Sequence, residues 1–316
     1  MGTISKETAE KLASAWGVSN SLADACKTAG IVTTDQRAMR RYRRQAEELL
    51  GVQLKTQRPQ NSSSNLPHST DLIHYDHAYT SVIFSDGHFW PGQTSRTFWI
   101  LLEILMDLEP EVVIDNGDSW DGAAVSRHAP TTWEHLPTLR EELDNLHDHM
   151  EMIEEAAGDA DLYRNIGNHD LRFEAKLAQQ APEMKGMPYT TISELFAGWR
   201  HNYSVCLSDE LIVKHRWHSG MHAAYNNVLK AGKSIATGHT HRLQVRPYSD
   251  YSGTRYGIET GTIADPYGPQ FSYGEDNPRD WHPGFVVVTL EDGKLFPEEV
   301  RVQDGQARFR GKTYRG

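Results

Sequence analysis

Short apolar runs, each followed at once by polar residues, recur along the central part of the chain and predict a series of buried strands. The five runs are Ser81–Phe84, Val112–Ile114, Tyr163–Ile166, Leu211–Val213 and Ser234–Ala236. Short apolar runs bounded by turn residues are typical of strands buried in a sheet. Because the carboxyl ends of neighbouring strands meet at one edge of an open α/β sheet, we expect the polar residues after these runs to form one site.

The polar motifs that follow the runs contain aspartate, histidine and asparagine but no cysteine. They read Asp86-Gly87-His88, Asn116-Gly117-Asp118, Gly167-Asn168-His169-Asp170, Lys214-His215 and Gly238-His239-Thr240-His241. Oxygen donors mixed with imidazoles suit Mn, Fe, Zn or Ni, whereas structural zinc sites favour thiolates. Each residue alone would more often be an ordinary polar residue or a helix cap. The clustered set predicts a divalent metal centre.

In this order the five motifs resemble those of the calcineurin-like metallophosphoesterases, which read Asp-x-His, Gly-Asp, Gly-Asn-His-Asp/Glu, His and Gly-His-x-His. The variants Gly-Asn-His-Asp-Leu-Arg and Gly-His-Thr-His-Arg are most similar to bacteriophage-encoded members. The resemblance implies an α/β fold with a four-layer α/β/β/α sandwich. It also implies hydrolysis of phosphoric esters by a hydroxide that bridges two divalent metal ions. We expect manganese first, with Fe, Zn, Ni or Mg as alternatives.

The resemblance assigns the metal ligands residue by residue. It places Asp86, His88 and His241 on one metal, Asn168, His215 and His239 on the second, and Asp118 between both. A shared carboxylate also has a physical reason, because two dications about 3.5–4 Å apart repel each other strongly. His218 is the alternative to His215, and the position of His215 directly after the strand favours the latter.

Residues close to these ligands are candidates for the chemistry. His169 follows a ligand and is expected to polarise the phosphoryl group or protonate the leaving oxygen, with Asp170 fixing its ring. Arg172 and Arg242 are expected to bind phosphate oxygens through two parallel hydrogen bonds, and surface ion pairs are the alternative. Asp121 is a candidate for orienting a metal-bound histidine.

Charge is distributed unevenly along the 316 residues, whose net charge is −11. Residues 1–60 contain ten Lys or Arg against six Asp or Glu, so the remainder is strongly acidic. An acidic domain does not attract nucleic acid by itself, and the basic N-terminal part is therefore the expected binding region. Two distant cysteines and the lack of a long apolar run argue against a disulfide framework and a membrane span. We expect a cytoplasmic protein of a bacterium or a phage-infected host, either monomer or homodimer.

Residues 1–54 have the pattern of a small three-helix domain. The expected helices are Thr8–Ala15, Ser21–Thr28 and Thr34–Leu50. The arginine-rich third helix after Gly30 resembles a Fis-type helix-turn-helix unit, which implies contact with DNA. The arginines expected to make that contact are Arg37, Arg40, Arg41 and Arg44. A solvated basic face on a docking or dimerising module is the alternative.

A polar stretch, residues 55–74, is expected to be a flexible linker to a single catalytic domain over residues 75–316. Within that domain Trp133–Ala157 has the apolar stripe of a long helix, used for packing or, alternatively, for dimerisation. The aromatic loop Thr262–Pro283 is expected to wall the active site and to stack on a base. Phe285–Leu290 and Leu295–Val302 predict a closing hairpin.

These patterns together predict a metal-dependent phosphoesterase, a hydrolase acting on phosphoric ester bonds. The first expectation for its substrate is a phosphodiester in nucleic acid, as for a nuclease, because the basic helices would recruit it. A small-molecule phosphatase or a cyclic-nucleotide phosphodiesterase is the enzymatic alternative. A DNA-binding regulator whose phosphoesterase domain is only a scaffold is the alternative of another class.

Overall fold

The chain divides into two compact units, Met1–Pro59 and Gln60–Gly316, each of which is described by itself. The computed structural model describes residues 4–16, 22–32, 36–52, 54, 70–128, 136–196 and 198–316, without the side chains of 22–24 and 36–40. Most of the expected linker, residues 55–69, lies outside the described part. Its end is not a linker, because Asp71–Ile73 forms strand β1, which pairs in parallel with β6 (Ser204–Leu207) and buries Ile73.

The N-terminal unit contains helices α1 (Lys6–Trp16), α2 (Leu22–Thr28) and α3 (Gln36–Leu50). Their small core is formed by Ala9, Leu12, Ala15, Ala25, Cys26, Ala29 and Ala46. Arg41 and Arg44 are exposed on α3, whereas the side chains of Arg37 and Arg40 lie outside the described part. The helix-turn-helix assignment and the DNA contacts stay predictions.

The larger unit contains two sheets. The eight-stranded sheet has the order β14-β13-β12-β11-β2-β3-β4-β5. Its strands are β2 (Tyr79–Phe84), β3 (Val112–Asp115), β4 (Asp161–Asn165), β5 (Arg200–Asn202), β11 (Gly284–Glu291), β12 (Lys294–Gln303), β13 (Gln306–Phe309) and β14 (Lys312–Arg315). The six-stranded sheet has the order β1-β6-β7-β8-β10-β9. Its further strands are β7 (Leu211–Lys214), β8 (Ser234–Thr237), β9 (Leu243–Asp250) and β10 (Gly253–Thr260). The five predicted strands and the closing hairpin β11–β12 are therefore confirmed.

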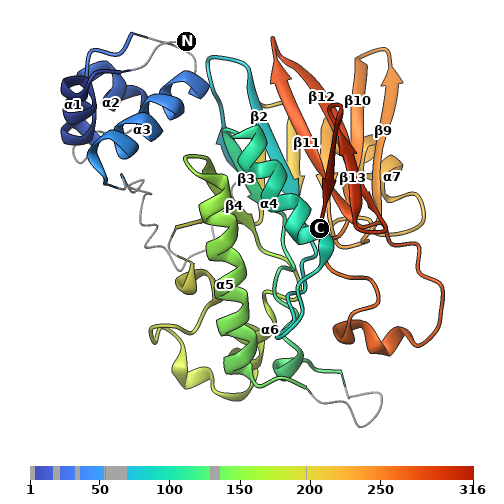
Figure 1. The fold of residues 1–316 in the computed structure, drawn as a ribbon. Helices are drawn as coiled ribbons and strands as arrows, with labels where there is room; N and C mark the ends of the chain where they lie inside the picture. The colour runs from blue at the N-terminus through green and yellow to red at the C-terminus, as the bar shows by residue number, and fades with distance from the viewer. Residues whose placement is uncertain are drawn as a thin grey trace. The chain divides into compact units, whose positions relative to one another are not determined.

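Helices cover the outer faces of both sheets, which gives the four layers α/β/β/α (Figure 1). Helices α4 (Arg96–Leu108) and α5 (Leu139–Ala157) pack on the larger sheet, and α7 (Ala223–Ala231) packs on the smaller one. The shorter helices are α6 (Arg172–Gln180), η1 (Ala123–Val125), η2 (Pro182–Met184), η3 (Ile192–Leu195) and η4 (Pro269–Gly274). Within the part of the chain described, no helix has the length and apolar character needed to cross a bilayer.

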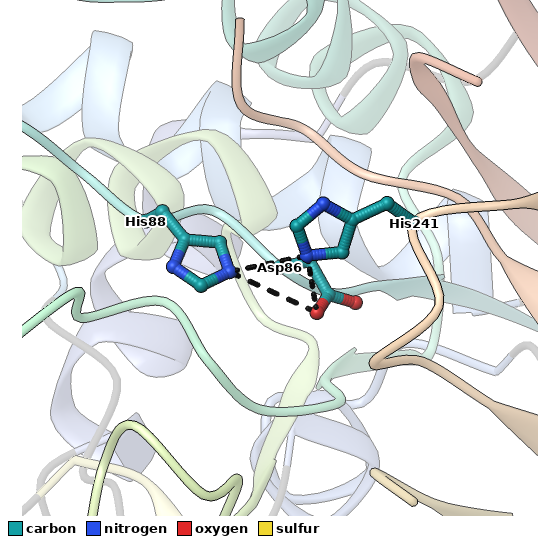
Figure 2. A group of neighbouring side chains, drawn as sticks. All are labelled: Asp86, His88 and His241. Carbon is teal, nitrogen blue, oxygen red and sulfur yellow. Dashed lines mark hydrogen bonds and ion pairs between the residues drawn. The ribbon is translucent and has the colours of Figure 1, made fainter. Parts of the chain in front are cut away.

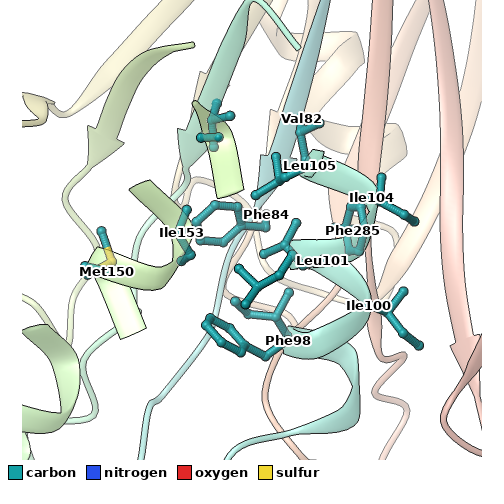
Figure 3. Close-up of a cluster of buried hydrophobic side chains, with 14 of the residues drawn as sticks. Val82, Phe84, Phe98, Ile100, Leu101, Ile104, Leu105, Met150, Ile153 and Phe285 are labelled. Carbon is teal, nitrogen blue, oxygen red and sulfur yellow. The ribbon is translucent and has the colours of Figure 1, made fainter. Parts of the chain in front are cut away.

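A buried apolar cluster between the larger sheet and helices α4 and α5 explains why these helices cover that sheet. Phe84 of β2 and Phe285 of β11 meet Phe98, Leu101 and Leu105 of α4 in a buried cluster (Figure 3). Leu146, Met150 and Ile153 of α5 join the same cluster, so the predicted apolar stripe packs within the chain.

Helix α5 begins later than the pattern predicted. Thr138 caps it through a capping box with Glu141, which places the first helical residue at Leu139 instead of Trp133. Residues 133–135 lie outside the described part.

Strand direction brings the polar motifs together. β2, β3 and β4 are parallel neighbours in one sheet, and β7 and β8 are parallel neighbours in the other. Two side-chain amides connect the sheets at these ends: Asn165 Nδ2 donates to the Val213 carbonyl (3.0 Å) and Asn116 Nδ2 to the Lys214 carbonyl (3.1 Å). The carboxyl ends of five strands therefore share one edge.

Candidate metal centre

The first cluster consists of Asp86, His88 and His241, and all three are buried (Figure 2). Asp86 and His88 follow β2, and His241 follows β8. His241 Nε2 lies 3.2 Å from Asp86 Oδ1 and 3.3 Å from His88 Nε2. The His88 ring donates from Nδ1 to Asp121 Oδ1 (3.0 Å), which leaves the lone pair of Nε2 directed at the cluster. This is the ligand set expected for one metal.

The second cluster consists of Asp118, His215 and His239. His215 Nε2 lies 3.0 Å from Asp118 Oδ2, although the two atoms do not form a hydrogen bond. Nδ1 of His215 donates to the Asn116 carbonyl (2.8 Å), so Nε2 is again the free ring nitrogen. His218, the alternative ligand, is not part of this cluster and its ring stacks on Trp217 instead.

Asn168 supplies a further test of whether these residues suit a cation. Its Oδ1 atom is buried and accepts no hydrogen bond from any described residue. A buried polar oxygen without a partner is costly in a folded protein unless an ion or water satisfies it. The backbone of Gly167, the residue before it, lies against Asp118, because a Cβ at Gly167 would be 2.1 Å from Asp118 Oδ1. With four imidazoles, two carboxylates and one amide oxygen, the donor set fits two divalent cations such as Mn or Zn.

Five residues of the two clusters have a strained backbone. The left-handed region is uncommon for residues other than glycine and costs free energy. Nevertheless, φ is positive at Asp86 (54°), His88 (38°), Asp118 (57°), His239 (70°) and His241 (59°). Strain of this kind persists where the surrounding structure requires one particular arrangement, and here it directs the side chains into the two clusters.

The charges in the clusters depend on one another. Burial alone would raise the pKa of Asp86, but the His241 and His215 imidazoles outweigh it and lower the pKa to about 2. Burial alone would lower the pKa of His215, but the Asp118 and Asp86 carboxylates outweigh it and raise the pKa to about 10. The carboxylates thus attract positive charge, which bound cations would supply in place of protons.

His169 lies beside the clusters and contacts Asp121 and Arg172. Its backbone N–H donates to Asp118 Oδ1 (2.7 Å), and its ring Nδ1 donates to the Asp121 carbonyl (2.8 Å). Arg172 also donates to that carbonyl (2.7 Å), and its Nη2 donates to His169 Nε2 (3.1 Å). Asp121 therefore touches both His88 and His169, in line with the orienting role expected for it.

The expected contact between Asp170 and the His169 ring is not found among the described residues, because the Asp170 side chain has other partners. One oxygen accepts the backbone N–H groups of Asp118 and Gly167 (both 2.9 Å), and the other pairs with Arg164 Nη2 (2.7 Å). Arg164 is fully buried and also pairs with Asp115 (2.9 Å). Asp170 therefore holds the loops after β3 and β4 together.

Arg242 forms an ion pair with a buried carboxylate, whereas the alternative expected for it was an ion pair at the surface. Its guanidinium donates to the buried Glu259 (3.1 and 3.2 Å) and to the Gly220 carbonyl (2.7 Å). Thr240, between the two histidines of its motif, donates to the same carboxylate (2.5 Å). Glu259 thereby fixes the loop that carries His239 and His241.

The aromatic loop over residues 262–283 lies against the first cluster. The Phe271 ring is buried 5.1 Å from the His88 ring, and the Trp281 ring lies 4.3 Å from the His241 ring. Tyr267 and Tyr273 in the same loop are exposed. The loop thus walls the histidines as expected, and its stacking on a base stays a prediction.

Three residues of the site were not predicted: Ser85, Arg164 and Glu259. Ser85 donates to Asp86 Oδ2 (2.5 Å) and is fully buried. A signal existed for Arg164 and Glu259, because each is a charged residue inside an apolar strand run. Such residues are rarely buried unless they are paired.

Comparison with known proteins adds distant similarities. No protein-family model matches the chain. The Gene 54 protein of Mycobacterium phage D29 is 22% identical over 256 residues, which covers 74% of this chain and 97% of that protein. The Gene 54 protein of Mycobacterium phage L5 is 27% identical over 95 residues, so the match spans 29% of this chain and only 36% of that protein.

Solved structures of three proteins each match more than two thirds of this chain. Vacuolar protein sorting 29 of Cryptosporidium parvum has 14% identity and a TM-score of 0.42, covering 76% of this chain and 100% of its own. YfcE, a phosphoesterase from E. coli, has 16% identity and a TM-score of 0.33, with coverages of 71% and 100%. A serine/threonine phosphatase of Saccharomyces cerevisiae has 11% identity and a TM-score of 0.34, with coverages of 77% and 87%. At these values none of them assigns a function to this chain.

Proposed function

We propose that this protein is a metal-dependent phosphoesterase that hydrolyses phosphodiester bonds. The observation that carries the proposal is the pair of Asp/His clusters, together with the buried Asn168 Oδ1, which has no hydrogen-bond partner in the described part of the chain. The backbone of the next residue, His169, donates to Asp118. Asp86, His88 and His241 would hold one cation, and Asn168, His215 and His239 the other. Asp118 would be shared between them.

Two bound divalent cations would neutralise charge on a phosphoryl group and lower the pKa of water at the site. The protein's own contribution is a positioned proton donor, His169. Burial alone would lower the pKa of His169, but the Asp121 and Asp118 carboxylates outweigh it and raise the pKa. The raised pKa favours a protonated ring. Nε2 would carry that proton to the leaving oxygen once Arg172, which donates to Nε2 in this structure, turns to the phosphoryl group.

Arg172 is the residue beside His169 that suits a phosphate oxygen. Its guanidinium is oriented by the Asp121 carbonyl, and its side chain is 22% exposed. A planar guanidinium donates two parallel hydrogen bonds to an oxyanion, which would place the phosphoryl group next to the proton donor. Arg172 also lies 3.8 Å from Asp121 Oδ2, a longer ion pair than that of Arg242. Arg242 is assigned no such role, because it donates to the fully buried Glu259 (3.1 and 3.2 Å) and to the Gly220 carbonyl.

For the substrate we propose nucleic acid, recruited in part by the basic N-terminal unit. The support is the charge of that unit and the exposed Arg41 and Arg44 on α3. Arginine contacts with phosphates supply most of the sequence-independent affinity for nucleic acid. A small-molecule phosphatase, a cyclic-nucleotide phosphodiesterase and a non-catalytic DNA-binding regulator are the other outcomes of the test below.

The test is a hydrolysis screen of metal-stripped protein with Mn²⁺, Zn²⁺, Ni²⁺, Fe²⁺ or Mg²⁺ added back. The substrates are bis-p-nitrophenyl phosphate, p-nitrophenyl phosphate, cyclic nucleotides, and single- and double-stranded DNA. We expect metal-dependent hydrolysis of the diester and of DNA. Hydrolysis of the monoester or cyclic nucleotide alone would identify a small-molecule enzyme, and no hydrolysis with any metal would overturn the proposal.

A further inference from the structure

One continuous part of the acidic chain contains no acidic residue. Between Leu211 and Ser249, a stretch of 39 residues, there is no Asp or Glu, although the whole chain contains 43. The same stretch contains six Lys or Arg residues. It includes the segment after β7 that begins at His215 and the motif with His239 and His241. Two of these six cations pair with carboxylates from outside the stretch, Lys233 with Asp209 and Arg242 with Glu259.

The segment 215–222, here called the Trp217 loop, is held firmly by its neighbours. The His218 backbone N–H donates to Asn227 Oδ1 (3.0 Å), and Asn227 Nδ2 donates back to the His218 carbonyl (3.1 Å). Arg242 donates to the Gly220 carbonyl (2.7 Å). With His215 anchored to the Asn116 carbonyl, the loop has fixed contacts at its start, middle and end.

This rigid loop exposes large apolar side chains. Trp217 is 44% exposed and Met221 is 80% exposed. The Trp217 ring stacks on His218 at a centroid distance of 5.2 Å and an interplanar angle of 27°. A partly exposed indole that is held by its neighbours can accept a planar group by stacking on its exposed part, with little loss of side-chain entropy.

Two basic residues of the same segment, Lys214 and Arg216, lie close to Trp217 in the sequence. Lys214 Nζ lies over the Trp217 ring, 5.7 Å from its centre, and Arg216 is exposed. In the described part of the chain neither Lys214 nor Arg216 forms an ion pair, whereas Lys233 pairs with Asp209 and Arg242 with Glu259. The uncompensated charge therefore lies next to the exposed aromatic ring.

We propose that the Trp217 loop is a binding subsite for single-stranded nucleic acid, with a base stacked on Trp217 and backbone phosphates on Lys214 and Arg216. An aromatic platform within a basic surface is the usual way to bind a single strand without sequence preference. Because the loop begins at a proposed metal ligand, a strand bound there would place one of its phosphodiesters near the clusters. The inference rests on the proposed function and names its substrate class.

The test measures binding of a fluorescein-labelled oligothymidylate by anisotropy, in EDTA so that no hydrolysis occurs. Every sample is the full chain with Arg41→Ala and Arg44→Ala, which removes the contribution of these two arginines to oligonucleotide binding. Trp217→Ala is compared with Trp217→Phe and with Trp99→Ala, a matched control because Trp99 is also 44% exposed but lies on α4. Thermal unfolding checks that each variant is folded.

We expect Trp217→Ala to weaken oligothymidylate binding roughly tenfold or more, Trp217→Phe to retain most of it, and Trp99→Ala to leave it unchanged. Lys214→Ala and Arg216→Ala should each reduce the log–log salt slope by about 0.7. Equal affinity of Trp217→Ala and Trp99→Ala would overturn the subsite, even if the wild-type protein hydrolyses diesters. Loss of binding in Trp217→Ala, with no hydrolysis by any metal-loaded wild-type sample, would instead keep the subsite and reject the phosphoesterase.

Discussion

Replacing Asp170 by asparagine distinguishes a structural role of this carboxylate from a role in fixing His169. Asp170 accepts the N–H groups of Asp118 and Gly167 at one oxygen and pairs with Arg164 at the other. Asparagine has nearly the same shape but no charge, and its amide can present an acceptor to only one of these two sides. Either Arg164 or the two N–H groups therefore lose their partner inside the protein.

The expected loss of stability follows from this geometry. Removing one partner of a buried ion pair costs about 3–5 kcal/mol. Because Arg164 keeps Asp115 at 2.9 Å, we expect the lower end of that range. A loss of about 3 kcal/mol corresponds to a Tm lower by roughly 6–12 °C in a domain of this size. Metal affinity should fall as well, since the backbone of Asp118 loses its anchor.

The assay is thermal unfolding in EDTA, so that bound metal does not contribute to stability. Asp144→Asn is the control, because Asp144 is 60% exposed and pairs with Arg140 at the surface. Such a pair contributes at most about 1 kcal/mol. If Asp170→Asn unfolds at the wild-type temperature, keeps its metals and loses only turnover, Asp170 acts on His169 and the structural reasoning is wrong.

Three further predictions concern the proton donor, a buried carboxyl group and the N-terminal helix. His169→Ala should keep both metals and lower kcat for bis-p-nitrophenyl phosphate by about two to four orders of magnitude; metal loss in this variant would make His169 a ligand. Burial raises the pKa of Glu142 from 4.5 to about 7 despite the N–H donors of Ala123 and Ala124. The folded protein therefore binds more protons than the unfolded chain in this window and loses stability as the pH rises from about 4.5 to 7. Glu142→Gln should reduce the difference in unfolding free energy between pH 5 and pH 8 by up to about 3 kcal/mol. An unchanged difference would contradict the burial argument. The double variant Arg41→Ala, Arg44→Ala should reduce the log–log salt slope of duplex DNA binding by about 0.9 for each lost phosphate contact, without altering bis-p-nitrophenyl phosphate hydrolysis. An unchanged slope would show that these two arginines of α3 do not contact DNA.

The strands were predictable because their signal is local. An apolar run closed by polar residues marks the end of β2, β3, β4, β7 and β8, and parallel pairing then brings those ends together. β1 was missed because its three residues follow a polar stretch and gain their strand conformation from β6, which is distant in the sequence.

The clusters were predictable for the same reason, whereas the groups that hold them were not. Arg164 meets Asp115, and Glu259 meets Thr240, only after separate strands have packed together. The expected contact of Asp170 with the His169 ring was wrong, because residues adjacent in the sequence can direct their side chains to different partners. The turn after β4 directs its side chain to Asp118, while His169 turns toward Asp121.

The most direct measurement is the metal content of purified wild-type protein and Asp118→Asn after reconstitution with Mn²⁺, together with their turnover of bis-p-nitrophenyl phosphate. We expect two ions per wild-type chain. We also expect the loss of at least one ion and of nearly all turnover in Asp118→Asn, because this carboxylate would compensate the charge of both cations. Two bound ions and wild-type turnover in Asp118→Asn would contradict the central claim.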